Sequence, residues 1–255
     1  MRHICAFFLC LCLLPLPVRG TEVRYAALTF DGGPSGKYTR QLLDGLYDRG
    51  IHATFLVCGT RIEANPEVLR RIREEGHEIG LHGYSLNPMD TMSRRDIAAE
   101  IADTQALLPP DCRPVFFRPP GGVCSDGVRQ VAEARGLAIL SWSVDLRDRA
   151  AAADALSVAQ TVTDGDILLL HDTNAGSVQA ALRIADALLE ADFQIVTVSE
   201  LARLRSLWEH IAGMNIEYAL PPKSWIEDGL GQRVRTPSCI MEEKCSTCLD
   251  STLLL

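Results

Sequence analysis

The sequence predicts an α/β protein built on a mainly parallel sheet that closes into a barrel. Strand and helix signals alternate between residues 23 and 207, which is the pattern of βαβ units. About seven strand signals occur in this region, a number that suits a barrel. Several strands end on a charged or imidazole side chain, and ligands bind at the carboxyl edge of such sheets.

The first predicted strand ends on a carboxylate at a turn. The apolar run AALTF ends at Asp31 and breaks at Gly32, Gly33 and Pro34. A strand that stops on Asp at a Gly/Pro turn places the carboxylate at the carboxyl edge of the sheet. Taken alone, Asp31 could equally be an ordinary solvated turn residue, because Asp-Gly is common turn chemistry.

The elements predicted after this strand continue the alternation of helices and strands. Apolar residues at helical spacing predict helices over 37–50 and 66–76, and each helix stops at a glycine. β-Branched and aromatic residues predict strands over 52–57 and 78–82.

The second half of the domain continues in the same way. Ser93 with Asp96 three residues later predicts the N-terminal cap of a helix over 92–108. The apolar run 115–118 ends on Arg118 at a Pro-Pro-Gly-Gly turn. The remaining predicted elements are helices over 125–135, 177–191 and 198–207 and strands over 137–144, 167–171 and 193–198.

Length and charge narrow the class of protein. A chain of 255 residues has room for one substantial domain. The net charge of −8 becomes −10 when Arg2 and Arg19 are removed with residues 1–20. Nucleic acid and anionic membranes need clustered Lys and Arg, so this acidic chain argues against both as partners. A neutral sugar polymer is compatible with the charge.

The N-terminal 20 residues predict a secretory signal. A short basic start is followed by the apolar run 4–16 and by small residues around Arg19. The run is too short for a spanning helix, and a buried first helix is disfavoured because a strand begins at Val23. We therefore expect a secreted or cell-envelope protein with no stable membrane insertion once 1–20 is removed. The barrel spans 21–206, and 207–255 is an extension of unknown role.

Six cysteines remain after residues 1–20 are removed: Cys58, Cys112, Cys124, Cys239, Cys245 and Cys248. An even number in an exported chain permits disulfides, but the sequence does not fix their pairing. The Cys245-x-x-Cys248 spacing allows a redox pair or half of a zinc site. No second CxxC accompanies it, so a local disulfide is the expected outcome.

Five predicted strand ends carry polar groups. They are Asp31, His82, Arg118, Asp145 with Asp148, and His171. One such residue is usually a satisfied buried polar group. Five that converge on one edge of a barrel point to a catalytic site instead.

The motifs around these residues resemble the polysaccharide deacetylase family (the NodB homology domain, carbohydrate esterase family 4). The segment TFDGGPS is similar to the family's TFDDGPS, and the later motifs follow in the family's order over about residues 23–205. The resemblance implies a distorted (β/α) barrel of seven strands. It also implies hydrolysis of a non-peptide C–N amide bond, most typically N-deacetylation of a cell-wall or chitin-like polysaccharide.

The resemblance also implies roles for individual residues. Asp31 corresponds to the general base, and Arg118 to the arginine that orients it. His171 corresponds to the acid that protonates the leaving amine, and Asp148 to the aspartate that tunes this histidine. A carboxylate–imidazole pair of this kind holds a histidine in one tautomer with a raised pKa.

The metal motifs depart from the family pattern. Active relatives bind a divalent ion, zinc or similar, through the second aspartate of the DD pair and two histidines in HxxxH. Here Gly32 and Leu86 stand at two of these positions, and His82 is the one retained ligand. One histidine cannot hold zinc, which takes three protein ligands in catalytic sites. Asn87 or Asp172 would have to assist His82.

Two further residues belong to the expected substrate side of the site. Gly121 replaces the usual Tyr of RPPYG and keeps the backbone amide expected in the oxyanion hole. Trp142 opens the segment WSVDLRD that leads to Asp148, and it is an expected substrate contact. Arg149 replaces the usual Trp and removes part of an apolar wall.

Three functions are consistent with this set. The first is N-deacetylation of an acylated polysaccharide such as peptidoglycan, with a weakened or rebuilt metal site. The second is a metal-independent amidohydrolase on the same fold. The third is a catalytically inactive glycan-binding protein, against which the retained acid–base residues argue. The sequence does not indicate the oligomeric state.

Overall fold

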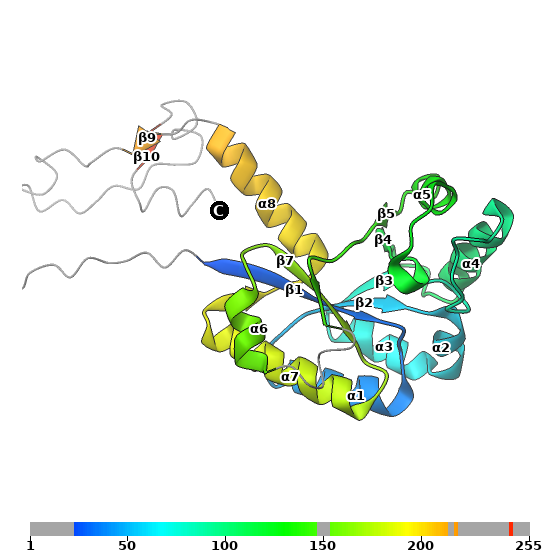
Figure 1. The fold of residues 1–255 in the computed structure, drawn as a ribbon, viewed down its shortest axis with the longest axis horizontal. Helices are drawn as coiled ribbons and strands as arrows, with labels where there is room; N and C mark the ends of the chain where they lie inside the picture. The colour runs from blue at the N-terminus through cyan, green and yellow to red at the C-terminus, as the bar shows by residue number, and fades with distance from the viewer. Residues whose placement is uncertain (1–22, 147–153, 214–216, 219–244, 247–255) are drawn as a thin grey trace, which may run out of the picture.

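The computed structural model of the protein describes residues 23–146, 154–213, 217–218 and 245–246 (Figure 1). The helices are α1 (Gly36–Tyr47), α2 (Gly59–Ala64), α3 (Pro66–Glu74), α4 (Arg94–Ala106), α5 (Asp126–Glu133), α6 (Ala155–Thr161), α7 (Ala175–Glu190) and α8 (Val198–Gly213), with a 3-10 turn, η1 (Pro120–Gly122). The strands are β1 (Arg24–Asp31), β2 (Thr54–Val57), β3 (Glu78–Leu81), β4 (Phe116–Phe117), β5 (Ala138–Ile139), β6 (Val144–Asp145), β7 (Asp166–His171), β8 (Phe193–Ile195), β9 (Glu217–Tyr218) and β10 (Cys245–Ser246).

The main sheet is parallel and curved, and the predicted α/β barrel class is confirmed. Its strand order is β5-β4-β3-β2-β1-β7-β6, with β8 also paired to β1. Every pairing within it is parallel. Helices α1, α2, α3, α6 and α7 cover one side of the sheet (Figure 1). The central position of β1 places its carboxyl end, Asp31, in the middle of the ligand-binding edge.

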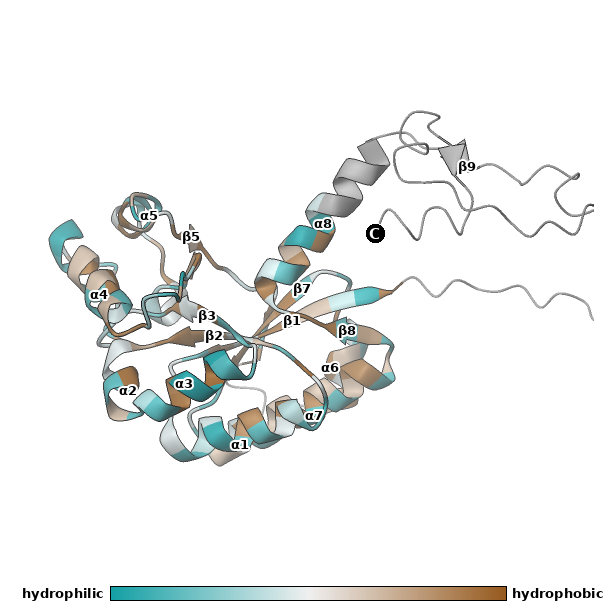
Figure 2. Ribbon diagram, turned by 180° about the vertical axis from the view of Figure 1, so that it is seen from behind, coloured by the Kyte–Doolittle hydropathy of each residue, from teal (hydrophilic) through white to brown (hydrophobic). Residues whose placement is uncertain are grey.

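Strand β1 divides its side chains between two cores. Ala26, Leu28 and Phe30 belong to the large cluster packed beneath the helices, while Ala27 belongs to a smaller cluster on the other face. Side chains alternate along a strand, so Asp31 lies on the same face as Ala27. Figure 2 shows the central strands as the apolar part of the fold, with polar residues on the outer faces of the helices.

One predicted strand is interrupted in the structure. The stretch 137–144 forms β5 at one end of the sheet order and β6 at the other. Between them, the carbonyl oxygens of Leu140 and Ser141 accept hydrogen bonds from the Arg118 guanidinium. An apolar run signals an extended segment but not a change of pairing partner, so the sequence could not indicate this break.

Other boundaries shift by a few residues, and two short helices, α2 and α6, were not expected. Helix α8 continues to Gly213, beyond the predicted end at 207. The predicted cap of α4 is confirmed, because Ser93 Oγ accepts a hydrogen bond from the Asp96 amide at 3.2 Å.

Some predictions concern residues outside the described part of the chain. These are the secretory signal, Asp148 with Arg149, and Cys239 with Cys248. Within the described residues, Cys58, Cys112 and Cys124 are free thiols. The helices described here include none that is both long and apolar enough to cross a membrane.

Candidate active site

The register of two central strands brings the predicted base and acid together. Strands β1 and β7 pair in parallel, with Asp31 directly opposite His171 and Thr29 opposite Leu169. Side chains at paired positions share a face of the sheet. Asp31 is 3% exposed and His171 is half-buried. The two residues therefore end neighbouring strands on the face that lines the barrel interior.

Arg118 holds the Asp31 carboxylate in place. Its Nη1 donates to Asp31 Oδ1 at 2.7 Å and to Thr29 Oγ1 at 2.8 Å. Its Nε and Nη2 donate to the carbonyl oxygens of Leu140 and Ser141 at 3.1 and 3.0 Å. The arginine is fully buried, and a buried charge needs both a counter-charge and hydrogen-bond partners. This network gives it both, and it leaves Asp31 Oδ2 without a contact to Arg118.

His82 is fixed in one tautomer. Its Nδ1 lies 2.8 Å from the Arg118 carbonyl oxygen, and since a carbonyl only accepts, Nδ1 carries the proton. Its Nε2 lies 3.9 Å from Asp31 Oδ2, too far for a hydrogen bond. Burial lowers the pKa of the imidazole, so Nε2 presents a lone pair to the site.

Asp172 ties the loop after Asp31 to the strand that carries His171, and sequence reasoning missed this role. It is fully buried, and its carboxylate accepts from Thr39 Oγ1 while its carbonyl oxygen accepts from Ser35 Oγ. Thr39 Oγ1 in turn accepts from the Ser35 amide at 2.7 Å. A Cβ on Gly33 would lie 2.3 Å from Asp172 Oδ2, so only glycine fits there. Burial raises the pKa of this carboxyl group to about 6.

Thr29 was also missed, although the pattern held a signal for it. A threonine two residues before a strand-end aspartate shares its face. Thr29 is buried and donates to the Leu168 carbonyl oxygen at 2.7 Å. It can therefore accept from Arg118 without losing its own donor.

The residues predicted to serve the oxyanion and the substrate, Gly121 and Trp142, lie on η1 and on the segment before β6. Gly121 is exposed with φ of 72°, and a Cβ there would meet nothing within 4 Å. A Cβ on Gly122 would lie 2.3 Å from the Trp142 ring. The Arg118 guanidinium carbon lies 5.4 Å from the centre of that ring. Trp142 is thus packed between the Gly122 backbone and the arginine that holds Asp31.

The remaining predicted residues lie at the end of β6 and on the loop after His82. Asp145 ends β6 opposite Leu169 and is exposed. Leu86 is half-buried with φ of 62°, and Asn87 is exposed. Asp148 lies outside the described residues.

The loop that carries Leu86 is anchored by Glu100 of α4, another residue that sequence reasoning missed. Its carboxylate accepts from the amides of Tyr84 and Ser85 at 2.7 and 2.8 Å and from Ser85 Oγ at 2.6 Å. One carboxylate thus fixes the backbone beside His82.

These residues do not fit a zinc-like ion. His82 has the tautomer of a metal ligand, with Nδ1–H held by a carbonyl, but Leu86 stands at the position where the family has its second histidine. Gly32 and Leu86 offer no donor, and the Asp172 carboxylate is turned to Thr39. Across the described ranges, no group of three His, Cys, Asp or Glu side chains could hold a metal ion.

Comparison with known proteins decides the family. The model of the family described as polysaccharide deacetylase matches residues 19–140. A peptidoglycan-N-acetylglucosamine deacetylase of Bacillus cereus is 35% identical over 188 residues, which cover 70% of this chain and 88% of that protein. The chain belongs to the polysaccharide deacetylase family.

Other members agree in sequence and in structure. The peptidoglycan-N-acetylmuramic acid deacetylase PdaC of Bacillus subtilis is 35% identical over 184 residues, 70% of this chain and 39% of PdaC. The solved structure of peptidoglycan deacetylase PdaC from Bacillus subtilis superimposes with a TM-score of 0.68 at 33% identity, covering 74% of this chain and 94% of that one. This chain thus spans about two fifths of the length of full PdaC. The family's distorted barrel is the fold described above.

Proposed function

We propose that this polysaccharide deacetylase family member removes acetyl groups from the N-acetylated sugars of a cell-wall polysaccharide. The observation that carries the proposal is the pairing of Asp31 with His171 across β1 and β7, with Arg118 holding Asp31. The similar proteins named as peptidoglycan deacetylases support the choice of peptidoglycan as substrate. Export of the chain by its first 20 residues would bring it to that polymer.

In this proposal Asp31 acts as the general base. Its Oδ1 is occupied by Arg118 Nη1, so Oδ2 is the oxygen that takes a proton from the attacking water. The fixed arginine keeps the carboxylate oriented while it does so. The Gly121 amide would donate to the oxyanion that forms on the acetyl carbon, as backbone amides do in other acyl-transfer sites.

His171 acts as the general acid in the second half of the reaction. The tetrahedral intermediate collapses when the C–N bond breaks, and the leaving amine takes a proton from the imidazole. Asp148 would hold the imidazole in the required tautomer, and Trp142 would line the sugar side of the cleft. The products are acetate and a free amino sugar.

The test is acetate release from purified peptidoglycan and from N-acetylglucosamine oligomers. Asp31→Asn and His171→Ala should each lower turnover by about 10²- to 10⁴-fold, the usual contribution of acid–base catalysis. Glu190→Gln, an exposed change on α7, is the matched control. Full turnover by His171→Ala would show that the acid is assigned to the wrong residue.

A metal titration separates this proposal from a metal-dependent one. Zinc or cobalt added to the purified chain should not bind stoichiometrically, since Gly32 and Leu86 supply no donor. Tight binding that is lost in His82→Ala would mean that the site is rebuilt around His82, and metal-dependent deacetylation would replace our mechanism.

The second candidate is an inactive glycan-binding protein, and the glycine and leucine at two ligand positions favour it. That function predicts retention on insoluble peptidoglycan without release of acetate, and retention that Asp31→Asn leaves unchanged. A metal-independent amidase acting on another amide would instead release no acetate and would not be retained.

A further inference from the structure

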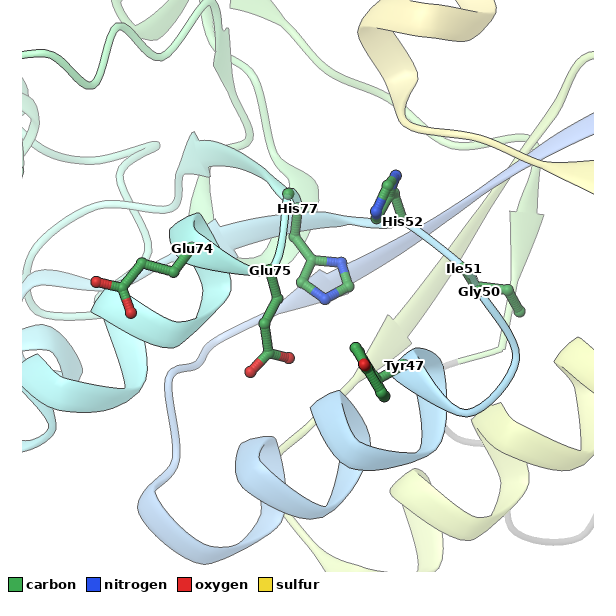
Figure 3. A pocket seen from close by; sticks show the side chains of 8 residues that line it. Tyr47, Gly50, Ile51, His52, Glu74, Glu75 and His77 are labelled. Carbon is green, nitrogen blue, oxygen red and sulfur yellow. The ribbon is translucent and has the colours of Figure 1, made fainter.

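A pocket (Figure 3) is lined by residues that precede β2 and β3, at the edge of the sheet opposite the candidate active site. Its volume is about 480 Å³, within the range of small-molecule sites. It is formed between the end of α1 with the segment leading into β2, and the end of α3 with the segment leading into β3. His77 and His82 flank β3 on its two ends, and five extended residues span roughly 16 Å. The pocket is therefore separate from the Asp31 site.

His77 supplies a directed hydrogen-bond donor to this pocket. Its Nδ1 accepts from the Ala53 amide at 3.1 Å, so Nε2 carries the proton. The residue is 7% exposed, and burial lowers the pKa of the imidazole to about 4, which keeps it neutral. Its ring is fixed edge-on against Phe55 and His52. Nε2 contacts no hydrogen-bonding group of the described residues.

Glu75 supplies an acceptor that lacks a partner. Its Oε1 accepts from Arg71 Nε at 2.5 Å, while Oε2 is buried with no hydrogen-bond partner among the described groups. A buried acceptor without a partner is destabilising. A turn of the Glu75 side chain that brings Oε2 into the pocket would let a ligand N–H or O–H remove that penalty. Figure 3 shows the side chains of Glu75, His77 and Tyr47 around the same space.

Tyr47 supplies an aromatic surface at the rim. Its side chain is 76% exposed, which is unusual for so large a ring, while the neighbouring Ile51 is 3% exposed. The apolar face of a pyranose ring packs well on such a surface, and Tyr adds a polar tip.

We propose that this pocket binds one neutral N-acetylated sugar unit. The acetamide carbonyl would accept from His77 Nε2, the acetamide N–H would donate to Glu75, and the sugar ring would lie on Tyr47. A free amino sugar lacks the acetamide carbonyl to which His77 Nε2 would donate, and an anionic ligand would be repelled by Glu74 and Glu75. The choice of an N-acetylated sugar rests on the proposed function. The site would anchor a second segment of the polymer while the first is in the cleft.

Backbone amide signals in NMR spectra of the full chain provide a local readout. The amides of Gly50 and Gly76 report on the pocket, and those of Gly121 and Gly122 report on the cleft. N-Acetylglucosamine added to the Asp31→Asn variant should shift the pocket signals, while glucosamine at the same concentration should not. Shifts confined to the cleft signals, or equal shifts with glucosamine, would overturn the inference.

Variants at Tyr47 and His77 test the assigned contacts. Tyr47→Ala should weaken binding at the pocket roughly tenfold, while Tyr47→Phe should stay within about twofold because it keeps the ring. His77→Asn keeps an acceptor for the Ala53 amide but loses the Nε2 donor, so it should also weaken binding. Unchanged binding in Tyr47→Ala or His77→Asn would refute the assignment.

The inference and the proposed function can fail separately. If the amide signals of the pocket shift but no acetate is released, the protein binds the sugar at this site without being a deacetylase. If acetate is released but the amide signals of the pocket do not shift, the protein is a deacetylase that lacks this second sugar site. If both hold, Tyr47→Ala should raise KM for polymeric peptidoglycan severalfold and leave kcat and the KM for short oligomers unchanged; a fall in kcat would contradict an anchoring role.

Discussion

The two halves of the candidate active site are built in different ways. The acid–base half consists of Asp31, Arg118, Thr29 and His171. Its groups lie on strands or, for Arg118, directly after one, and the guanidinium of Arg118 makes four hydrogen bonds to strand and loop groups. Neighbouring parallel strands fix the positions of their end residues relative to one another, so this half is held by the barrel itself.

The metal half consists of Gly32, His82 and Leu86, and it depends on loops. Gly32 and Leu86 both have positive φ, 84° and 62°. The loop between His82 and Leu86 is held from outside, through Glu100. Each expected ligand is a separate side chain on such a loop, so two of them can be absent while the acid–base half keeps its geometry.

This difference means that the metal half could be rebuilt without disturbing the other. We expect the double variant Gly32→Asp, Leu86→His to bind zinc stoichiometrically in calorimetry, while each single variant does not. A Cβ on Gly32 would have only Thr173 Cγ2 near it, at 3.7 Å. Asp and His are among the residues that tolerate positive φ best. We expect zinc to bind because the two introduced side chains and His82 would give three ligands close together, which is the smallest set that holds catalytic zinc.

The control for that gain is His82→Ala in the double variant, which should abolish binding. Zinc binding by the double variant that survives this control would place the ion elsewhere. No binding at all would mean that the two loops do not bring positions 32, 82 and 86 together.

Removing Arg118 should disrupt the acid–base half most severely. Arg118→Met leaves Asp31 as a buried charge without its partner, and breaking a buried pair in this way costs about 3–5 kcal/mol of unfolding free energy. Urea denaturation measures the loss. Arg70→Met removes an exposed pair with Glu74 and should cost under about 1 kcal/mol. Equal losses of unfolding free energy in the two variants would show that the buried network stabilises the fold no more than an exposed ion pair does.

Asp172 should make stability depend on pH. Its pKa of about 6 lies above the ordinary value of 3.8, so the native state keeps a proton that the unfolded chain has lost. Stability therefore falls as pH rises from about 4 to about 6, by roughly 3 kcal/mol in total. Asp172→Asn should remove this slope, seen in the difference between the two denaturation curves at each pH.

A second variant sharpens the test. Thr39→Val removes the hydrogen bond that favours the charged carboxylate, so it should raise the pKa of Asp172 further and shift the loss of stability to higher pH. If the free energy of unfolding depends on pH in the same way for the wild-type chain, Asp172→Asn and Thr39→Val, Asp172 is not the source of the pH dependence.

The strand-borne part of the site was the part that sequence could predict. A run such as AALTF ending on Asp31 fixes both a strand and the edge where its last residue lies, and the structure places Asp31 opposite His171 as the barrel requires. Arg118 was predicted as a partner of Asp31 only through the family resemblance, and the contact of 2.7 Å is present.

The supporting groups could not be predicted, because they depend on contacts between distant segments. Thr39 and Asp172 are 133 residues apart in sequence, and no local pattern links them. Likewise, nothing in the stretch 137–144 indicates that its carbonyls turn to Arg118 instead of a neighbouring strand. The pocket around His77 was missed because its residues read as ordinary ends of helices and strands.

The smallest expected effect concerns the loop of the metal half. Glu100→Gln replaces charge-assisted hydrogen bonds to the amides of Tyr84 and Ser85 by neutral ones, and it should cost about 1 kcal/mol of unfolding free energy. Amide hydrogen exchange at Tyr84 and Ser85 should become faster. Glu133→Gln, exposed on α5, is the matched control. Acetate release should change by less than about twofold, since the acid–base half is held independently by Arg118. A loss of activity as large as that of Asp31→Asn would mean that the two halves form one cooperative unit and do not keep their geometry independently.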